Sequence, residues 1–361
     1  MNLKSILFSG YIFCILISGV LSTQISSLIH FIIVRPLSLV IMVKRFRSSY
    51  IIILVCLILS TLKNNFDYYI GSGIDNYLIF LYFYLSIVFF DIGVRFNVPT
   101  HKYLEYVPLT LAAIAGIQVA ILILSSLDQN FSLYLTDRGI EPTRISLGNA
   151  LEAQITLTLV AYAFQKHSKN KGAKLATLFI LLISNAVAQT RILIVCSFAM
   201  LVRSLFKFSY KWLVFGLAFG VLVMITIGEY FQIERLTFND LVSGGSTLDR
   251  LNLLFISIDL ISTPEIIFGY GAGGFSYYHE NAFGIKKSVE NAIIQMLIEF
   301  GLVGFVVFFL CISKSINIVT KKQKIDPILI ILLLQVAVMM PINAMLPVQA
   351  FLIGIIYASK H

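Results

Sequence analysis

Residues 290–312 read ENAIIQMLIEFGLVGFVVFFLCI, an apolar run that begins where the longest polar stretch of the chain ends. An α-helix needs roughly 20 consecutive apolar residues to cross the hydrocarbon core of a bilayer. The run is continuous, whereas the strands of a transmembrane β-barrel alternate between apolar and polar residues. We therefore predict a membrane-spanning helix over these residues.

The rest of the chain repeats this pattern. Of its 361 residues, 58% are hydrophobic and 12% are charged, and the mean hydropathy is +0.90. A soluble domain has about 25% charged residues. These values predict an all-α polytopic membrane protein, with residues 1–361 forming a single integral membrane domain. Twelve spans are expected, near residues 5–21, 25–43, 49–63, 75–93, 104–126, 149–165, 174–189, 190–206, 211–228, 290–312, 326–342 and 345–358. Because residues 174–206 are divided into two spans, a tight turn is expected at Ala188–Thr190.

Basic residues are unevenly distributed among the predicted loops. The net charge is +9, and most Lys and Arg residues fall in clusters at 44–47, 166–174, 203–211 and 314–324. All four clusters lie on the same side of the predicted spans, which marks that side as cytoplasmic. Both termini are then cytoplasmic. Because the charge follows membrane topology, it argues against nucleic acid as a partner.

The longest polar stretch is predicted to be an outer-face loop over residues 229–289. Within it, residues 248–261 have the periodicity of an amphipathic helix that lies on the membrane surface or packs over the spans. Its predicted apolar face consists of Leu251, Leu254, Phe255, Ile258 and Ile261. Thr263-Pro264 ends this helix. The glycines of Gly269–Gly274 follow no predicted strand, so they are no dinucleotide fingerprint and are expected to form a closely packed, irregular turn.

Arg191 is the most informative charged residue within a predicted span. It follows the polar residues Asn185, Gln189 and Thr190. An arginine in a span usually faces a polar cavity or a partner, so Arg191 is a candidate for binding an anionic group. The alternative is that its side chain reaches out to the membrane interface.

Further candidates lie in the outer loops. Arg250, beside Asp249, could hold a phosphate bidentately or form a local ion pair, and Arg144 belongs to a smaller outer loop near 127–148. Glu290, near Lys287 and Asn291, is a candidate general base or substrate-orienting group, or a carboxylate that stabilises the helix start.

His279 and Glu280 are titratable candidates that otherwise read as mobile surface-loop residues. The four cysteines lie in apolar runs without metal-ligand spacing, so no metal and no cofactor is expected.

Four stretches in this order resemble the O-antigen polymerase / O-antigen ligase superfamily of bacterial envelope enzymes. They are Asn185–Arg191, Thr247–Leu251, Pro264–Phe275 (PEIIFGYGAGGF) and Glu290–Phe305 (ENAIIQMLIEFGLVGF). The resemblance implies a GT-C-like glycosyltransferase that uses undecaprenyl-diphosphate-linked glycans on the outer face of the bacterial cytoplasmic membrane, without metal or nucleotide sugar. Membrane lipids and a chain-length regulator would be its other partners.

By this resemblance, Arg191 and Arg250 would hold the donor diphosphate, with Arg144, Lys287 and Asn291 as further substrate-binding candidates. Glu290, His279 or Glu280 would supply the base for an inverting displacement. The ligase branch carries a histidine where this chain has Glu290, so the resemblance favours a polymerase of repeat units.

Two alternatives remain. A ligase that joins finished polymer to the lipid A core would use His279, which lies upstream of Glu290. A non-enzymatic flippase would show internal duplication and paired broken spans, and neither is evident in the sequence.

Overall fold

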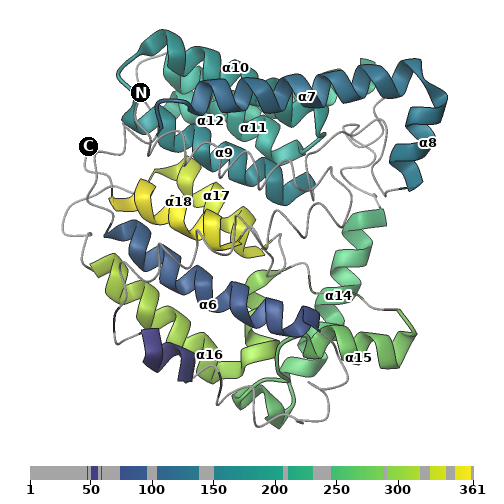
Figure 1. Ribbon diagram of the computed structural model, residues 1–361, viewed down its shortest axis with the longest axis vertical. Helices are drawn as coiled ribbons and strands as arrows, with labels where there is room; N and C mark the ends of the chain where they lie inside the picture. The colour runs from purple at the N-terminus through teal and green to yellow at the C-terminus, as the bar shows by residue number, and fades with distance from the viewer. Residues whose placement is uncertain are drawn as a thin grey trace. The chain divides into compact units, whose positions relative to one another are not determined.

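The structure is a computed structural model. It describes residues 47, 50–55, 58, 74–95, 104–137, 150–205, 210–230, 245–285, 287, 289, 291–317, 326–338 and 346–358. Within these ranges every regular element is a helix (Figure 1), which confirms the predicted all-α class. The elements are α6 (Ile74–Val94), α7 (Val107–Leu127), α8 (Gln129–Asp137), α9 (Ala150–His167), α10 (Lys171–Val187), α11 (Arg191–Leu205), α12 (Tyr210–Tyr230), α14 (Gly245–Ile261), the 3-10 helix η4 (Pro264–Ile267), α15 (Gly274–Phe283), α16 (Ala292–Asn317), α17 (Pro327–Val338) and α18 (Leu346–Ala358).

The helices α6, α7, α9 to α12 and α16 to α18 coincide with predicted spans to within a few residues. Among the described residues, Val107–Leu127 and Ala292–Cys311 are long and apolar enough to cross a membrane. Shorter apolar helices occur at Ile79–Val94, Val214–Thr226 and Leu346–Tyr357. The predicted spans near 5–21 and 25–43 lie outside the described residues, and the number of twelve stays a prediction.

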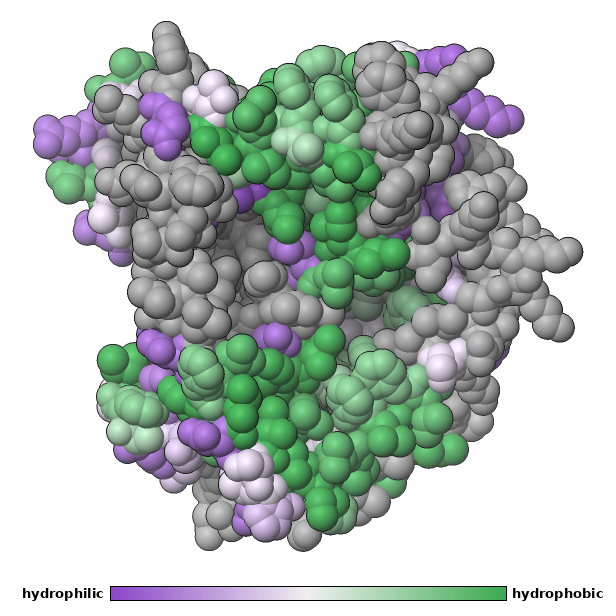
Figure 2. Space-filling model, turned by 180° about the vertical axis from the view of Figure 1, so that it is seen from behind, coloured by the Kyte–Doolittle hydropathy of each residue, from purple (hydrophilic) through white to green (hydrophobic). Residues whose placement is uncertain are grey.

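Large apolar side chains are exposed on the helices that coincide with predicted spans. Figure 2 shows apolar side chains over broad areas of the described surface. On α12, for example, Phe215 and Leu222 are 51% and 60% exposed. Lipid tails would cover such side chains, so this surface is consistent with membrane association.

The chain divides into two compact units, and each is described by itself. The first contains α7 to α12. In it, α10 packs against α7, α9 and α11. The predicted tight turn between α10 and α11 is confirmed: α10 ends at Val187 and α11 begins at Arg191.

The second unit contains residues 50–55, α6 and α14 to α18. Its closest helix pair is α6 and α18 (Figure 1). A Cβ atom on Gly354 would lie only 2.6 Å from the Phe90 carbonyl oxygen, and one on Gly93 would collide with the Phe351 carbonyl. These two glycines therefore allow the backbones to approach.

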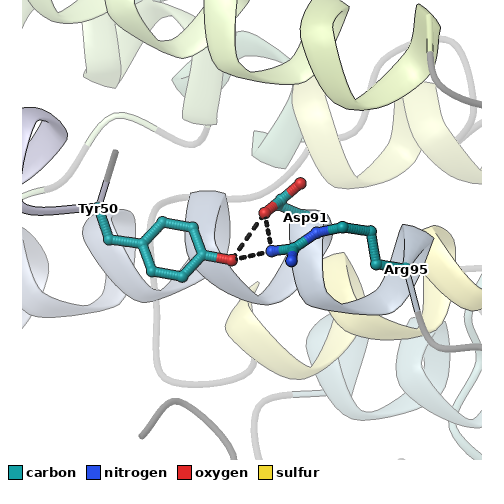
Figure 3. Close-up of polar contacts among 3 residues, drawn as sticks. All are labelled: Tyr50, Asp91 and Arg95. Carbon is teal, nitrogen blue, oxygen red and sulfur yellow. Dashed lines mark hydrogen bonds and ion pairs between the residues drawn. The ribbon is translucent and has the colours of Figure 1, made fainter. Parts of the chain in front are cut away.

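A polar cluster fixes residues 50–55 to the end of α6 (Figure 3). The Tyr50 hydroxyl donates to Asp91 Oδ2 at 2.6 Å, and Arg95 forms an ion pair with Asp91 and a hydrogen bond to Tyr50. Tyr50 is 1% exposed. A charge-assisted set of this kind is stronger than neutral hydrogen bonds, so it ties these two segments together.

The predicted outer loops contain helices beyond the amphipathic one that was expected. The loop near 127–148 contains the helix α8, and the loop over 229–289 contains the helix α15. On α14, the buried side chains are Leu253, Ser257 and Leu260. Phe255 and Ile258, which belong to the predicted apolar face, are exposed. Ile261, which also belongs to the predicted face, packs against the apolar cluster that α14 shares with α16, so both sides of α14 carry apolar residues and the predicted face is only partly buried.

Candidate functional site

The second unit contains a break inside α16 that receives the glycine turn. At Gly301 the backbone angles are φ 68° and ψ −171°, which interrupts the helix. An interruption removes the intrahelical donors of the carbonyl groups just before it. The Tyr270 N–H donates to the Ile298 carbonyl at 2.7 Å, and the Gly271 N–H donates to the Glu299 carbonyl at 2.9 Å. The glycine turn thus satisfies the carbonyl groups that the break leaves open.

Both partners in this contact need to be glycine. A Cβ atom on Gly269 would lie 2.5 Å from the Glu299 carbonyl oxygen, and one on Gly301 would collide with the backbone of Phe268. Gly269, Gly271 and Gly273 also have positive φ angles of 80°, 83° and 78°, which L side chains rarely adopt. The predicted close packing of this turn is confirmed.

Glu299 lies two residues before the break, and its side chain is 1% exposed. Its Oε1 atom accepts a hydrogen bond from Gln295 Nε2 at 3.0 Å. The backbone amide of Gly273 also interacts with the carboxyl group. Among the described residues, the Oε2 atom has no hydrogen-bond partner. Buried carboxyl groups without full pairing are costly and are often functional in membrane helices.

Glu299 is absent from the residues predicted as site residues from the sequence. One signal points to it: it is an acidic residue in the interior of an apolar run. Such a residue in a predicted span is a functional candidate by default.

His279 lies on α15 and is 6% exposed, so the expectation of a mobile surface-loop residue was wrong. Its Nδ1 atom is 2.6 Å from the Ile285 carbonyl oxygen. Because a carbonyl only accepts, Nδ1 carries the hydrogen, and the lone pair of the neutral ring is on Nε2. Phe275 and Phe283 pack near the ring, at centroid distances of 6.1 Å and 4.8 Å. This arrangement fixes the orientation of a potential base.

The other candidates of the second unit have different surroundings. Glu280 is exposed on α15, which again corrects its assignment to a mobile loop. Asn291 stabilises the start of α16, because its Oδ1 atom accepts from the Ile294 N–H at 3.0 Å. Lys287 is half-buried. Glu290 lies outside the described residues.

Arg191, in the first unit, is the first residue of α11 and is partly exposed. A helix N-terminus carries partial positive charge, so the guanidinium group adds to a field that already attracts anions. Arg250 lies in the second turn of α14, and its side chain lies outside the part of the chain that the structure describes. Arg144 lies outside the described residues.

The turn before Arg191 is held by Asn185, which is 0% exposed. Its Nδ2 group donates to Ser197 Oγ at 2.7 Å and to the Leu193 carbonyl at 3.3 Å. The Thr190 N–H donates to the Asn185 carbonyl at 3.1 Å. Asn185 and Thr190 therefore belong to a bonded network that fixes the start of α11, and a polar pocket at Arg191 stays a prediction.

A second buried polar group borders this network. The Ser184 hydroxyl lies 2.5 Å from Gln118 Oε1 and 3.1 Å from Gln154 Oε1. Gln118 and Gln154 belong to α7 and α9 and are 0% exposed. Hydrogen bonds between buried side chains specify how helices pack, so these contacts fix α7, α9 and α10 relative to one another.

No protein-family model matches this chain, and no curated protein or solved structure matches it.

The structure thus places His279, Glu280, Lys287 and Asn291 in the second unit and Arg191 in the first. Within the ranges described, no group of three His, Cys, Asp or Glu side chains is arranged to hold a metal ion. The chemistry available in these ranges consists of a cationic helix start, an oriented imidazole and a buried carboxyl group.

Proposed function

We propose that this protein is a glycosyltransferase that polymerises undecaprenyl-diphosphate-linked repeat units into O-antigen or capsular polysaccharide. The reaction takes place on the outer face of the bacterial cytoplasmic membrane, and the chain crosses that membrane about twelve times. The observation that supports this most is the contact between Gly269–Gly271 and Glu299–Gly301. Both stretches belong to the resemblance to O-antigen polymerases and ligases. Because they depend on each other sterically, their joint occurrence is more informative than either stretch alone.

Arg191 supplies the electrostatic part of the mechanism. In the transfer, the bond between the anomeric carbon of the donor glycan and the diphosphate oxygen breaks, and negative charge develops on the undecaprenyl diphosphate leaving group. A guanidinium at the N-terminus of α11 stabilises that charge. Arg250 is the second guanidinium in this proposal.

The acceptor hydroxyl supplies the nucleophile. It attacks the anomeric carbon from the face opposite to the leaving diphosphate, which inverts the configuration. A general base takes the hydroxyl proton as the new bond forms. The resemblance to polymerases assigns the role of this general base to Glu290.

One observation favours the related ligase as a second candidate. His279 Nδ1 donates to the Ile285 carbonyl, so Nε2 has the lone pair that a general base needs. In this reading His279 deprotonates an acceptor hydroxyl of the lipid A core. A flippase is less favoured: outside α16, no described helix has a left-handed residue in its interior, whereas transporters of that kind have paired broken helices.

Surface glycan from cells that lack the gene tests the proposal. Complementation uses the wild-type chain and Arg191→Ala at equal protein levels. The proposal predicts that the deletion leaves lipid A with one repeat unit, and that only the wild type restores a ladder of polymer lengths on a gel. Full-length polymer on undecaprenyl diphosphate with bare lipid A would instead indicate the ligase. Repeat units that accumulate on the inner face would indicate a flippase.

A further inference from the structure

We propose that Glu299 is a positioning residue, which holds α15 against the break in α16 and thereby sets where the side chains of this helix lie in the transferase site. This inference rests on the proposed function for the meaning of that site. Glu299 contacts the glycine turn twice. Its carbonyl oxygen accepts from the Gly271 N–H at 2.9 Å, and its carboxyl group interacts with the amide of Gly273.

The start of α15 lacks a cap of its own. Its N-cap residue is Gly273, which has no side chain that could form a capping hydrogen bond, and the first turn has no acidic residue. A carboxyl group near a helix N-terminus is favourable because it meets open N–H groups and the positive end of the helix dipole. The Glu299 carboxyl group, which comes from α16, supplies what the sequence of α15 does not provide.

Gln295 orients this carboxyl group. It lies one turn before Glu299 on α16 and is 1% exposed, and its Nε2 group donates to Glu299 Oε1 at 3.0 Å. The pair is enclosed, because Glu299 is also 1% exposed and its chain neighbour Ile298 belongs to a buried apolar cluster. A hydrogen bond in such surroundings has little competition from water. The carboxyl group is therefore held in one place.

The start of α15 in turn determines where its side chains lie. His279 follows Gly273 by six residues, roughly 9 Å along a helix. Tyr277 and Tyr278, which are 48% and 41% exposed, lie on the same short helix. A shift at the first turn would displace all three. Glu299 acts on the transfer through α15 without touching the substrate.

Hydrogen exchange of the full-length protein in detergent tests this proposal. The variants are Glu299→Ala, Glu299→Gln and Gln295→Leu. The matched control is Glu265→Gln, because Glu265 is exposed on η4 close to the same turn. We expect the amides of Tyr270, Gly271 and α15 to exchange at least tenfold faster in Glu299→Ala, which corresponds to about 1.4 kcal/mol. Exchange in α10 and α11 should not change, because they belong to the other unit.

Glu299→Gln separates positioning from chemistry. Glutamine keeps the length of the side chain and an oxygen acceptor, so exchange within about twofold of wild type and at least half of the polymer yield are expected. Gln295→Leu should accelerate exchange at α15 by a smaller factor than Glu299→Ala. It also keeps the proposal testable if Glu299→Ala fails to fold.

Unchanged exchange at α15 in both Glu299→Ala and Gln295→Leu would overturn the proposal. So would a Glu299→Gln protein with normal exchange and no polymer, because the carboxyl group would then take part in the chemistry directly. If wild-type protein makes no polymer, the proposed function fails, while the exchange data still decide whether Glu299 holds α15.

Discussion

The backbone of Gly269 lies directly against the backbone of Gly301, and neither residue has room for a Cβ atom. Gly301→Ala adds a methyl group that collides with Phe268 and strains a φ of 68°. The backbone angles of Gly301, φ 68° and ψ −171°, lie in a region that is essentially restricted to glycine, and holding another residue there costs about 1–3 kcal/mol. We therefore expect Gly301→Ala to lower the free energy of unfolding by about 2–4 kcal/mol, measured by denaturant titration in detergent micelles.

Two other glycines serve as graded controls. Gly284 has a φ of 70° but open space around its Cβ position, so Gly284→Ala should cost about 1 kcal/mol. Gly116 lies in the interior of α7 with nothing within 4 Å, so Gly116→Ala should be neutral or slightly stabilising. Equal stabilities of the Gly301→Ala and Gly116→Ala proteins would contradict the steric account.

Asn185 is expected to dominate the stability of the α10–α11 hairpin. Asn185→Ala removes donors to Ser197 and to the Leu193 carbonyl in a fully buried position. Loss of such bonds costs about 1–3 kcal/mol. Thermal unfolding should show a lower midpoint for this variant. Asn252→Ala, at an exposed helical position, should change stability by less than about 0.5 kcal/mol; a similar loss in both variants would argue against the network.

Arg191 is predicted to bind the diphosphate of the donor through paired hydrogen bonds. Arg191→Lys keeps the charge but loses the planar fork, so the Kd for undecaprenyl diphosphate should rise roughly tenfold, since hydrogen bonds to charged groups contribute about 1.5–3 kcal/mol. Arg203 lies in the last turn of the same helix. Binding that is unchanged in Arg191→Lys, or weakened equally by Arg203→Lys, would exclude this role.

His279 allows a test that separates polymerase from ligase. His279→Asn places an amide where Nδ1 donates to the Ile285 carbonyl, so α15 keeps its C-terminal contact while the Nε2 lone pair is lost. In a polymerase this variant should retain most of the glycan ladder on gels. In a ligase it should lower the transfer to lipid A by at least 10²-fold, as expected for loss of a general base.

The long helices could be predicted because each is a continuous apolar run, and the turn before Arg191 because polar residues interrupt such a run. The helix α15 could not, because it has only ten residues, Gly274–Phe283 (GFSYYHENAF), and directly follows a run of glycines, which disfavours helix. Its ends depend on Gly273 and Gly284 in left-handed conformations and on Glu299 from another helix. Interactions distant in sequence therefore stabilise it.

Two features of the site were not predictable for a related reason. On α14, Leu253 and Leu260 face the core while Phe255 and Ile258 face outward. When both sides of a helix are apolar, periodicity does not tell which side is buried. Glu299 can be picked out of the sequence as an isolated acid in an apolar run, but its contact with the start of α15 follows only from the break at Gly301 and the turn that docks there.

The most direct test of the polymerase account uses the purified protein in liposomes with undecaprenyl-diphosphate-linked repeat units extracted from cells that lack the gene. The account predicts a ladder of lipid-linked polymers, one molecule of undecaprenyl diphosphate released for each bond formed, and neither product with Arg191→Ala. If the wild-type protein leaves the single repeat units unchanged while they carry the correct glycan, the account is contradicted.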